Sequence, residues 1–207
     1  MGSPGYRRTC VLRESHGGDS SRRHRCRRSH HRALAGRDVG LGHHPHAIPD
    51  FRASLAVLTV SDTRTEADDR SGAAITELLE QAGHTRIDYR ILPDEPRQVG
   101  QQVRTWIQVP ELDGVLINGG TGIAPRDTTY EAVYGLLERR LDGFGELFRM
   151  LSYREIGARA MLSRAVAGIA GGKLVFSMPG STPAVTLAMK ELILPQLPHL
   201  AGELRKS

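Results

Sequence analysis

The chain of 207 residues has the length of one ordinary domain with room for an additional tail. No apolar run reaches the roughly 18 residues that a membrane-spanning helix needs, so we expect no membrane partner. The net charge of +5 is unevenly placed: residues 1–50 hold ten arginines, no lysine and four acids, a net of +6, which leaves −1 for residues 51–207. Binding to nucleic acid would therefore depend on the first 50 residues alone, and we do not expect it of the rest of the chain.

Residues 1–50 show neither helical nor strand periodicity. Their few apolar residues cannot offset the entropy lost on ordering, so we predict a disordered Arg/His-rich tail, or else an extension from a wrongly placed start codon. The tail lacks the apolar stretch of a secretory signal, and its cysteine and histidines lack the paired spacing of a zinc site. Both cysteines, Cys10 and Cys26, lie here, which argues against a disulfide scaffold and indicates a reducing cytoplasm.

From residue 51 onward, strand and helix patterns alternate along the chain. Strands are predicted at Ser54–Val60, 87–93 and 113–117, and helices with one apolar face at 71–83, 96–109 and 129–140. This alternation is typical of βαβ units with a mostly parallel sheet, whose right-handed crossovers place helices on both faces. We therefore predict a three-layer α/β/α domain over residues 51–207.

The last third of the chain adds an amphipathic helix and a hairpin. The helix has apolar residues at the spacing i, i+3, i+4, i+7: Phe144, Leu147, Phe148 and Leu151. This face either packs in the core or forms an oligomer interface. Two short apolar runs then flank a Gly-Gly pair, as in a hairpin, and the second run, Lys173–Met178, precedes a predicted helix at 185–194.

The most informative loop is NGGTGIAPRD, residues 118–127, which directly follows the third predicted strand. It is not a P-loop, because no Gly-Lys-Ser/Thr follows, and it lacks the third glycine of the dinucleotide fingerprint. Its glycines let backbone N–H groups approach an anion, Arg126 can pair with phosphate, and Asp127 can bind a hard cation such as Mg²⁺. The alternative is a tight turn in which Asp127 or Thr128 caps the next helix.

Three further loops are expected at the same sheet edge, because ligands in such folds bind beyond the carboxyl ends of the strands. LPDEP holds Asp94 between two prolines that restrict the backbone, and SDTR presents Ser61 and Asp62. PGSTPA offers Gly180 and Ser181 before a helix as a second anion cradle. Each loop could also be a simple turn or helix cap, but four of them at one edge favour a ligand site.

The chemistry of these loops points to phosphate transfer. The part of the chain after residue 50 has no cysteine and only two histidines, His84 and His199, both outside the loops, so a Ser-His-Asp set is not expected. Phosphoryl or nucleotidyl transfer relies mainly on positioning, a metal ion and positive charge, which these loops could supply.

Five segments, in this order, resemble those of the MoaB/Mog family of molybdenum-cofactor biosynthesis: LTVSDTR, ILPDEP, INGGTGIAPRDTTYEAV, GFGELFRMLSYREIGARAMLSRAVAGI and VFSMPGSTPAV. The resemblance runs from about Leu55 to about Leu200 and leaves out the tail. The fourth segment resembles the MoaB branch more than the MogA branch.

The resemblance implies an adenylyltransferase that moves AMP from Mg·ATP, its co-substrate, onto the terminal phosphate of molybdopterin and releases pyrophosphate. It assigns the family's two important acids, with catalytic and Mg²⁺-binding roles, to Asp94 and Asp127, and it implies a homotrimer or homohexamer. It also assigns a nucleotide-phosphate loop to Gly119, Gly120, Thr121 and Gly122. A second loop, which helps hold the pterin, is assigned to Pro179, Gly180 and Ser181.

Three alternatives stay open. The first is a non-catalytic molybdopterin-binding or scaffold protein, because some MoaB proteins look catalytically silent. In those proteins the Arg-Asp segment is altered, whereas here Arg126, Asp127 and Thr128 are intact. The second is nucleic-acid binding through the tail. The third is a related fold that acts on another nucleotide.

Overall fold

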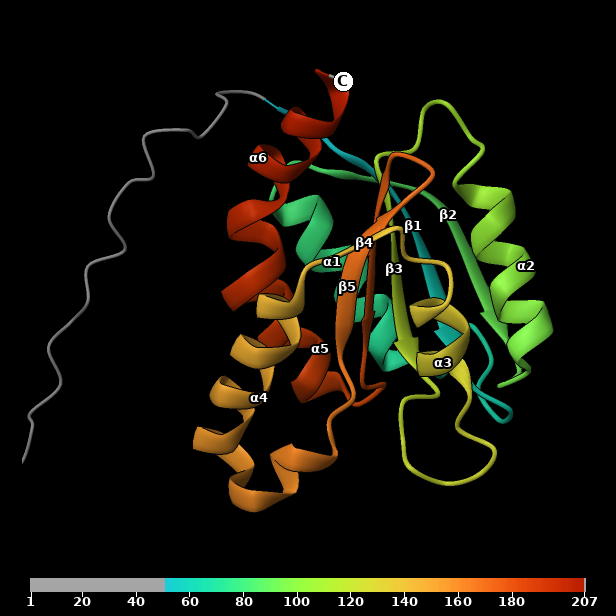
Figure 1. Ribbon diagram of the computed structural model, residues 1–207, viewed down its shortest axis with the longest axis vertical. Coiled ribbons are helices and arrows are strands. Elements are labelled where there is room, and N and C mark those ends of the chain that lie inside the picture. Colours follow the sequence, from blue (N-terminus) through green and yellow to red (C-terminus); the bar gives the residue numbers. More distant parts are fainter. Residues whose placement is uncertain (1–50, 207) are drawn as a thin grey trace, which may run out of the picture. The chain divides into compact units, whose positions relative to one another are not determined.

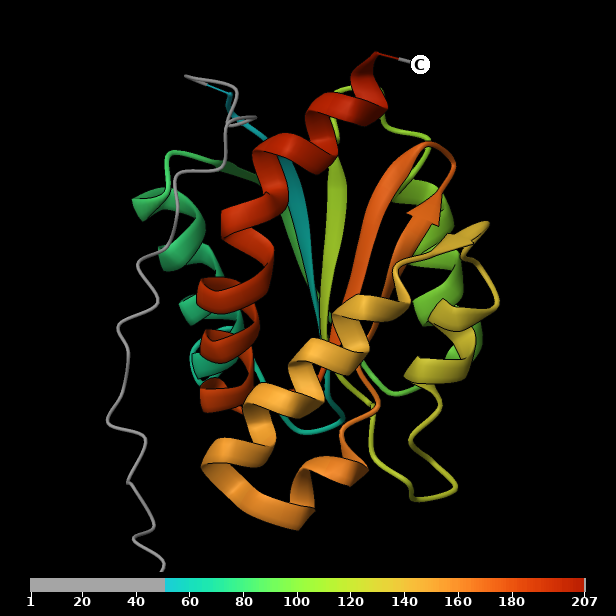
Figure 2. The ribbon, with the colours of Figure 1, turned by 60° about the vertical axis from the view of Figure 1, so that its left-hand side comes forward.

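The computed structural model describes residues 51–206, and the predictions made for residues 1–50 lie outside this range. A six-stranded sheet with the order β2-β1-β3-β6-β5-β4 forms the centre of the domain. Helices cover both of its faces, as the three-layer prediction requires (Figures 1 and 2). In the described residues, no helix is long and apolar enough to cross a membrane.

Four neighbouring strands are parallel, and their carboxyl ends lie at one edge. They are β2 (Thr85–Leu92), β1 (Ser54–Val60), β3 (Gly114–Gly119) and β6 (Lys173–Met178). Val60 pairs with both Leu92 and Gly119, and Asn118 pairs with Met178. The four loops that the sequence singles out therefore start at almost the same level of the sheet.

The remaining two strands, β5 (Val166–Ala170) and β4 (Arg139–Arg140), are antiparallel to their neighbours and make the sheet mixed. β5 and β6 form the predicted hairpin. Its two loop residues, Gly171 and Gly172, have φ of +55° and +71°, the left-handed backbone that a two-residue hairpin turn needs and glycine adopts readily.

Alternate residues of β1, β3, β5 and β6 belong to two separate cores. Leu55 and Val57 of β1 face one core, whereas Ala56, Leu58 and Val60 face the other. Helices α1 (Arg70–Gln81), α4 (Asp142–Ile156), α5 (Thr182–Ala188) and α6 (Leu194–Arg205) close the first core, and α2 (Pro96–Trp106) and α3 (Thr129–Tyr134) close the second (Figure 2). Both strand faces are buried, which explains the continuous apolar runs of β1 and β3.

Three predicted helices differ from the observed ones. The helix predicted at 129–140 ends at Tyr134, because the chain then turns at Gly135 and enters β4. The helix predicted at 96–109 ends at Trp106. The helix predicted at 185–194 starts earlier, passes through a wider π-helical turn, η2 (Met189–Ile193), and continues as α6. Pro195 has no N–H to donate, and a local change of hydrogen-bond pattern accommodates such a residue.

The amphipathic helix α4 packs part of its apolar surface in the core and leaves part of it exposed. Phe144 and Phe148 lie in the core, and Phe144 meets Phe176 edge to face at 5.3 Å. Other apolar side chains of α4 and of the 3₁₀ helix that follows it, η1 (Gly157–Leu162), are exposed: Leu147, Met150, Tyr153, Ile156, Met161 and Leu162.

Candidate functional site

The glycine loop, defined here as residues 120–128 between β3 and α3, requires a glycine at its first position. Gly120 has φ of +60°, and a Cβ there would lie 2.6 Å from Asp94 Oδ2 and would clash with Thr129 Oγ1. The carbonyl of Gly120 accepts a hydrogen bond from the Thr129 amide at 3.2 Å. The missing side chain therefore lets the start of the loop lie against both Asp94 and the first turn of α3.

Asp94 lies on the loop after β2 and holds the end of the glycine loop. Its Oδ1 accepts hydrogen bonds from the Thr128 amide at 3.2 Å, the Thr128 hydroxyl at 3.2 Å and the Thr129 hydroxyl at 3.0 Å. Asp94 does not cap its own helix: α2 begins after Glu95, which makes no side-chain cap bond. Its second oxygen, Oδ2, accepts no hydrogen bond from residues 51–206.

Asp127 is itself a residue of the glycine loop, directly before Thr128. Its Oδ2 accepts a hydrogen bond from the Ala124 amide at 3.0 Å, while its own amide donates to the Ala124 carbonyl at 2.9 Å. Gly122 lies so close that a Cβ there would be 2.9 Å from the Asp127 carboxyl carbon. Within the described part of the chain, Oδ1 of Asp127 has no hydrogen-bond donor. Each of the two predicted acids thus uses one oxygen to shape the loop and leaves one oxygen available.

Asp62 and Arg126 are paired with each other. The Arg126 guanidinium donates to Asp62 Oδ2, and Asp62 Oδ1 accepts a bond from the Asp94 amide at 3.2 Å. Ser61 Oγ accepts bonds from the amides of Thr63 and Arg64, so it shapes its own turn. A cavity of about 410 Å³ opens here, lined by Ser61, Asp62 and Arg64 on one side and the end of β2 on the other.

The loop after β6 contacts the glycine loop at its origin. A Cβ on Gly180 would lie 2.9 Å from the Gly119 Cα, so the two loops meet backbone to backbone. Arg64 donates from both terminal nitrogens to the Gly180 carbonyl at 3.2 Å. Ser181 stands at the N-cap position of α5 without a side-chain cap bond. Pro179, Gly180 and Ser181 are at least partly accessible to solvent, whereas Thr121 of the glycine loop is buried. The structure therefore brings all the predicted loops together at one edge of the sheet.

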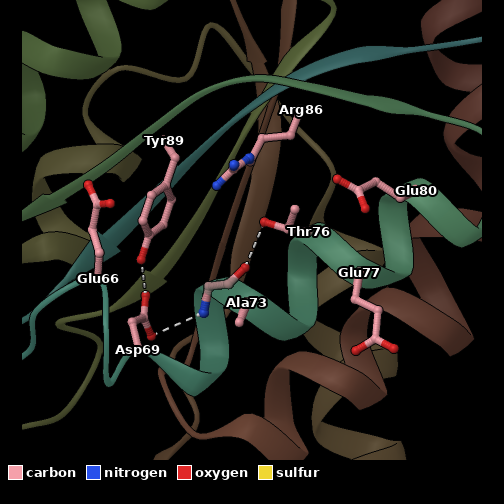
Figure 3. Close-up of a pocket in the computed structure, with 9 residues that line it drawn as sticks. Glu66, Asp69, Ala73, Thr76, Glu77, Glu80, Arg86 and Tyr89 are labelled. Atoms are coloured by element: carbon pink, nitrogen blue, oxygen red, sulfur yellow. Dashed lines mark hydrogen bonds between the residues drawn. The ribbon is translucent and has the colours of Figure 1, made fainter.

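A buried carboxylate that the sequence analysis missed lies behind these loops. Asp69, the N-cap residue of α1, accepts hydrogen bonds from the hydroxyls of Thr59 and Ser71 and from the Gly72 amide. It also accepts one from the Tyr89 hydroxyl (Figure 3). Burial by itself would raise the pKa of Asp69, but these bonds outweigh it and lower the pKa from 3.8 to about 2. The pKa of Tyr89 is raised by burial and by its bond to Asp69.

Asp69 is linked to the site through neighbouring side chains. Arg64, which holds Gly180, lies 3.3 Å from Asp69 Oδ1. The Ser71 hydroxyl oxygen also lies 2.9 Å from Asn118 Oδ1, so the single hydroxyl hydrogen is shared between Asp69 and Asn118, and Asn118 directly precedes Gly119. An aspartate just before the predicted first helix is a sequence signal for a cap. The sequence gives no sign of its two distant hydroxyl partners, Thr59 on β1 and Tyr89 on β2.

Arg164 is the second residue that the sequence analysis missed. It follows η1, about 40 positions after the glycine loop, yet its guanidinium donates to the carbonyls of Thr121 at 3.0 Å, Gly122, and Asp127 at 2.9 Å. It also pairs with Glu131 and lies 5.0 Å from the centre of the Tyr130 ring. An arginine after a predicted helix carries no sequence signal of this contact.

The donor set fits magnesium better than a transition metal. In residues 51–206 no group of three or more His, Cys, Asp or Glu side chains could hold a metal ion by itself. Mg²⁺ is usually bound by one or two carboxylates together with substrate phosphates and water. The available oxygens of Asp94 and Asp127 beside a glycine loop match that kind of incomplete site.

Comparison with known proteins gives a consistent answer. Residues 56–199 match the family model described as a probable molybdopterin binding domain. The chain is 52% identical over 151 residues to the molybdenum cofactor biosynthesis protein B of Halalkalibacterium halodurans, covering 72% of this chain and 89% of that one. The protein of the same name from Bacillus subtilis is 48% identical over 164 residues, covering 79% and 96%.

A solved structure agrees with the sequence comparison. The crystal structure of the molybdopterin biosynthesis enzyme MoaB from Thermus thermophilus superposes with a TM-score of 0.67 at 38% identity, covering 75% of this chain and 98% of that one. The family match spans all the loops at the carboxyl edge of the sheet. The chain therefore belongs to the MoaB/Mog family of molybdenum cofactor biosynthesis proteins, in its MoaB branch.

Proposed function

We propose that this protein acts in molybdenum cofactor biosynthesis as a molybdopterin adenylyltransferase. In this reaction an oxygen of the terminal phosphate of molybdopterin attacks the α-phosphorus of ATP. The bond from that phosphorus to the bridging oxygen breaks, and pyrophosphate leaves. The observation that supports the proposal is the pair Asp94 and Asp127. Asp94 follows β2 and contacts the glycine loop, Asp127 belongs to that loop, and each leaves one carboxylate oxygen without a donor in residues 51–206.

In this proposal Asp94 and Asp127 would hold Mg²⁺, which when bound offsets the charge of the triphosphate and of the attacking phosphate. The chain's own residues do the positioning. Backbone amides of the glycine loop would face phosphate oxygens, and Arg126, which is paired with Asp62 at the surface, would exchange that partner for a phosphate. The attacking phosphate is already an anion, so no histidine base is needed.

The loop of Pro179, Gly180 and Ser181 would hold the pterin substrate. Its contact with Gly119 places the two proposed binding loops side by side, as a transfer between two substrates requires. Arg64 fixes the Gly180 carbonyl, so this loop has a defined shape before any ligand binds. Ser61 and Asp62 complete the rim of the site.

The proposal is tested by incubating molybdopterin and Mg·ATP with the native protein and with Asp127→Asn and Asp94→Asn. Asparagine keeps one oxygen to accept the loop's hydrogen bonds, so the fold should be retained while the charge is lost. We expect adenylylated pterin to form at least ~100-fold more slowly, as for loss of one charge-stabilising group. The matched control is Asp142→Asn, an exposed carboxylate at the start of α4.

The outcome separates the proposal from its first alternative. If the native protein binds molybdopterin but forms no adenylylated product, it is a non-catalytic binding or scaffold protein. If both asparagine variants react as fast as the native protein, the two acids have no part in the chemistry.

The remaining features of the proposal concern the whole chain. We assign residues 51–207 to the molybdopterin-binding domain, residues 1–50 to a separate Arg/His-rich tail, and the protein to the cytoplasm. The exposed apolar side chains of α4 and η1 support a homotrimer or homohexamer, because a surface of this kind is common at subunit interfaces. Deleting residues 1–50 should leave the adenylyl transfer unchanged and would abolish any binding to nucleic acid.

A further inference from the structure

Arg164 reaches both ends of the glycine loop with a single side chain. Its Nε donates to the Thr121 carbonyl, and its Nη2 donates to the carbonyls of Gly122 and Asp127. Its Nη1 pairs with Glu131 on α3. The side chain is only 24% exposed, so these bonds are partly shielded from water. Three carbonyls of one loop therefore point toward the same planar group.

The direction of these carbonyls fixes the direction of the amides on the same peptide bonds. A trans peptide is planar, so its N–H points opposite to its C=O. The N–H groups of Gly122 and Ile123 therefore point away from Arg164. In the described range they have no hydrogen-bond acceptor, and Ile123 is 70% exposed.

The peptide bond between Asp127 and Thr128 has the same geometry, and its N–H already has an acceptor. The Asp127 carbonyl points to Arg164, and the amide on the other side of that bond, from Thr128, donates to Asp94 Oδ1 at 3.2 Å. An anionic oxygen thus already lies on the side of the loop opposite Arg164. The outward amides of Gly122 and Ile123 offer the same kind of interaction to a ligand.

We infer that Arg164 is a positioning residue that holds the glycine loop in the shape that turns the Gly122 and Ile123 amides outward to bind a polyphosphate. The inference rests on the proposed function for the identity of the ligand, but the loop-holding role does not depend on it. Arg164 does not touch the ligand; it acts through the loop backbone from the opposite side.

Lysine cannot replace arginine in this role. A guanidinium presents donors in a fixed fork that can span three carbonyls, whereas an ammonium is a point charge. Arg164→Lys therefore keeps the charge and removes the geometry. Glu131→Gln is the complementary variant, because it removes the ion pair and leaves the three carbonyl bonds in place.

The first experiment needs no ligand. We expect hydrogen exchange of the segment 120–130 to become faster in Arg164→Lys, with the exchange of β1 and β3 unchanged and the circular dichroism spectrum native. The matched control is Arg104→Lys on α2, which lies outside the loop. Equal exchange of the segment in Arg164→Lys and the native protein would overturn the inference.

The second experiment measures Mg·ATP binding by calorimetry and KM and kcat for adenylyl transfer. We expect Arg164→Lys to weaken binding and raise KM by about 10-fold or more, with a smaller change in kcat, as for loss of charge-assisted hydrogen bonds. Glu131→Gln should change either value by less than about 3-fold. Guanidinium ion added to Arg164→Ala should restore part of the binding.

The two proposals fail in different ways. If the native protein binds Mg·ATP and Arg164→Lys binds it equally well, the inference is wrong and the proposed function stands. If the native protein binds no Mg·ATP, the proposed function is wrong, and the exchange experiment alone decides whether Arg164 holds the loop.

Discussion

The buried carboxylate of Asp69 makes a quantitative prediction about stability and pH. Its pKa is about 2 in the folded protein, against 3.8 for the unperturbed group. A depressed pKa stabilises the fold at pH values above the unfolded pKa, and this stabilisation is lost as the pH falls through the folded pKa. With about 1.4 kcal/mol per pKa unit, the ionised group contributes about 2 kcal/mol at pH 7, and about half of this is lost by pH 3.

Asp69→Asn tests this reasoning because asparagine is of similar size and cannot ionise. We expect urea unfolding at pH 7 to show a loss of about 2 kcal/mol in Asp69→Asn. The difference between the native protein and the variant should shrink to about 1 kcal/mol at pH 3, since only the native protein loses the contribution of this carboxylate.

Other acids titrate in the same range, so the difference between variants is the quantity to compare. Asp142→Asn, an exposed carboxylate, should keep a nearly constant difference from the native protein. If Asp69→Asn and the native protein lose equal stability between pH 7 and pH 3, the hydrogen bonds from Thr59, Ser71 and Tyr89 do not stabilise the ionised form as argued.

Two further predictions concern the glycine loop and the surface of α4. Gly120→Ala should lower the free energy of unfolding by at least ~1–2 kcal/mol, because alanine disfavours the positive φ of this position. It should also weaken Mg·ATP binding, because a Cβ would displace Asp94 and Thr129. Urea denaturation measures the first effect and calorimetry the second, and unchanged values would contradict the close packing of Gly120. Tyr153→Arg, at a residue 63% exposed on α4, should reduce the proposed oligomer to monomers in sedimentation velocity, whereas Ile87→Arg on β2 should not. Unchanged sedimentation of Tyr153→Arg would contradict an interface at this surface.

The strands and the position of the loops could be predicted because they depend on local patterns. Continuous apolar runs identify parallel strands buried on both faces, and parallel strands carry their following loops to one edge. Asp94 and Asp127 were thus expected at the same edge, and the structure places both against the glycine loop. Their proposed roles come from the family resemblance and stay predictions.

The contacts of Arg164 and Asp69 could not be predicted, because each depends on how distant segments meet. Arg164 bonds to carbonyls about 40 residues away, and backbone carbonyls leave no mark in a sequence. Asp69 looks like an ordinary helix cap until β1 and β2 supply Thr59 and Tyr89. The early end of α3 was missed because the leucines that follow it, Leu136 and Leu137, continue the helical spacing while packing against the core from an irregular segment.

The bond between Arg64 and the Gly180 carbonyl joins positions 116 residues apart. One partner follows β1 and the other follows β6, the first and last strands of residues 51–206, so the site cannot be completed before β6 has entered the sheet between β3 and β5. A chain still emerging from the ribosome without β6 and the segment after it would carry Asp94, Asp127 and the glycine loop but would lack the wall that the proposed pterin needs. The proposed binding of the pterin therefore requires β6 and the loop after it to be in place.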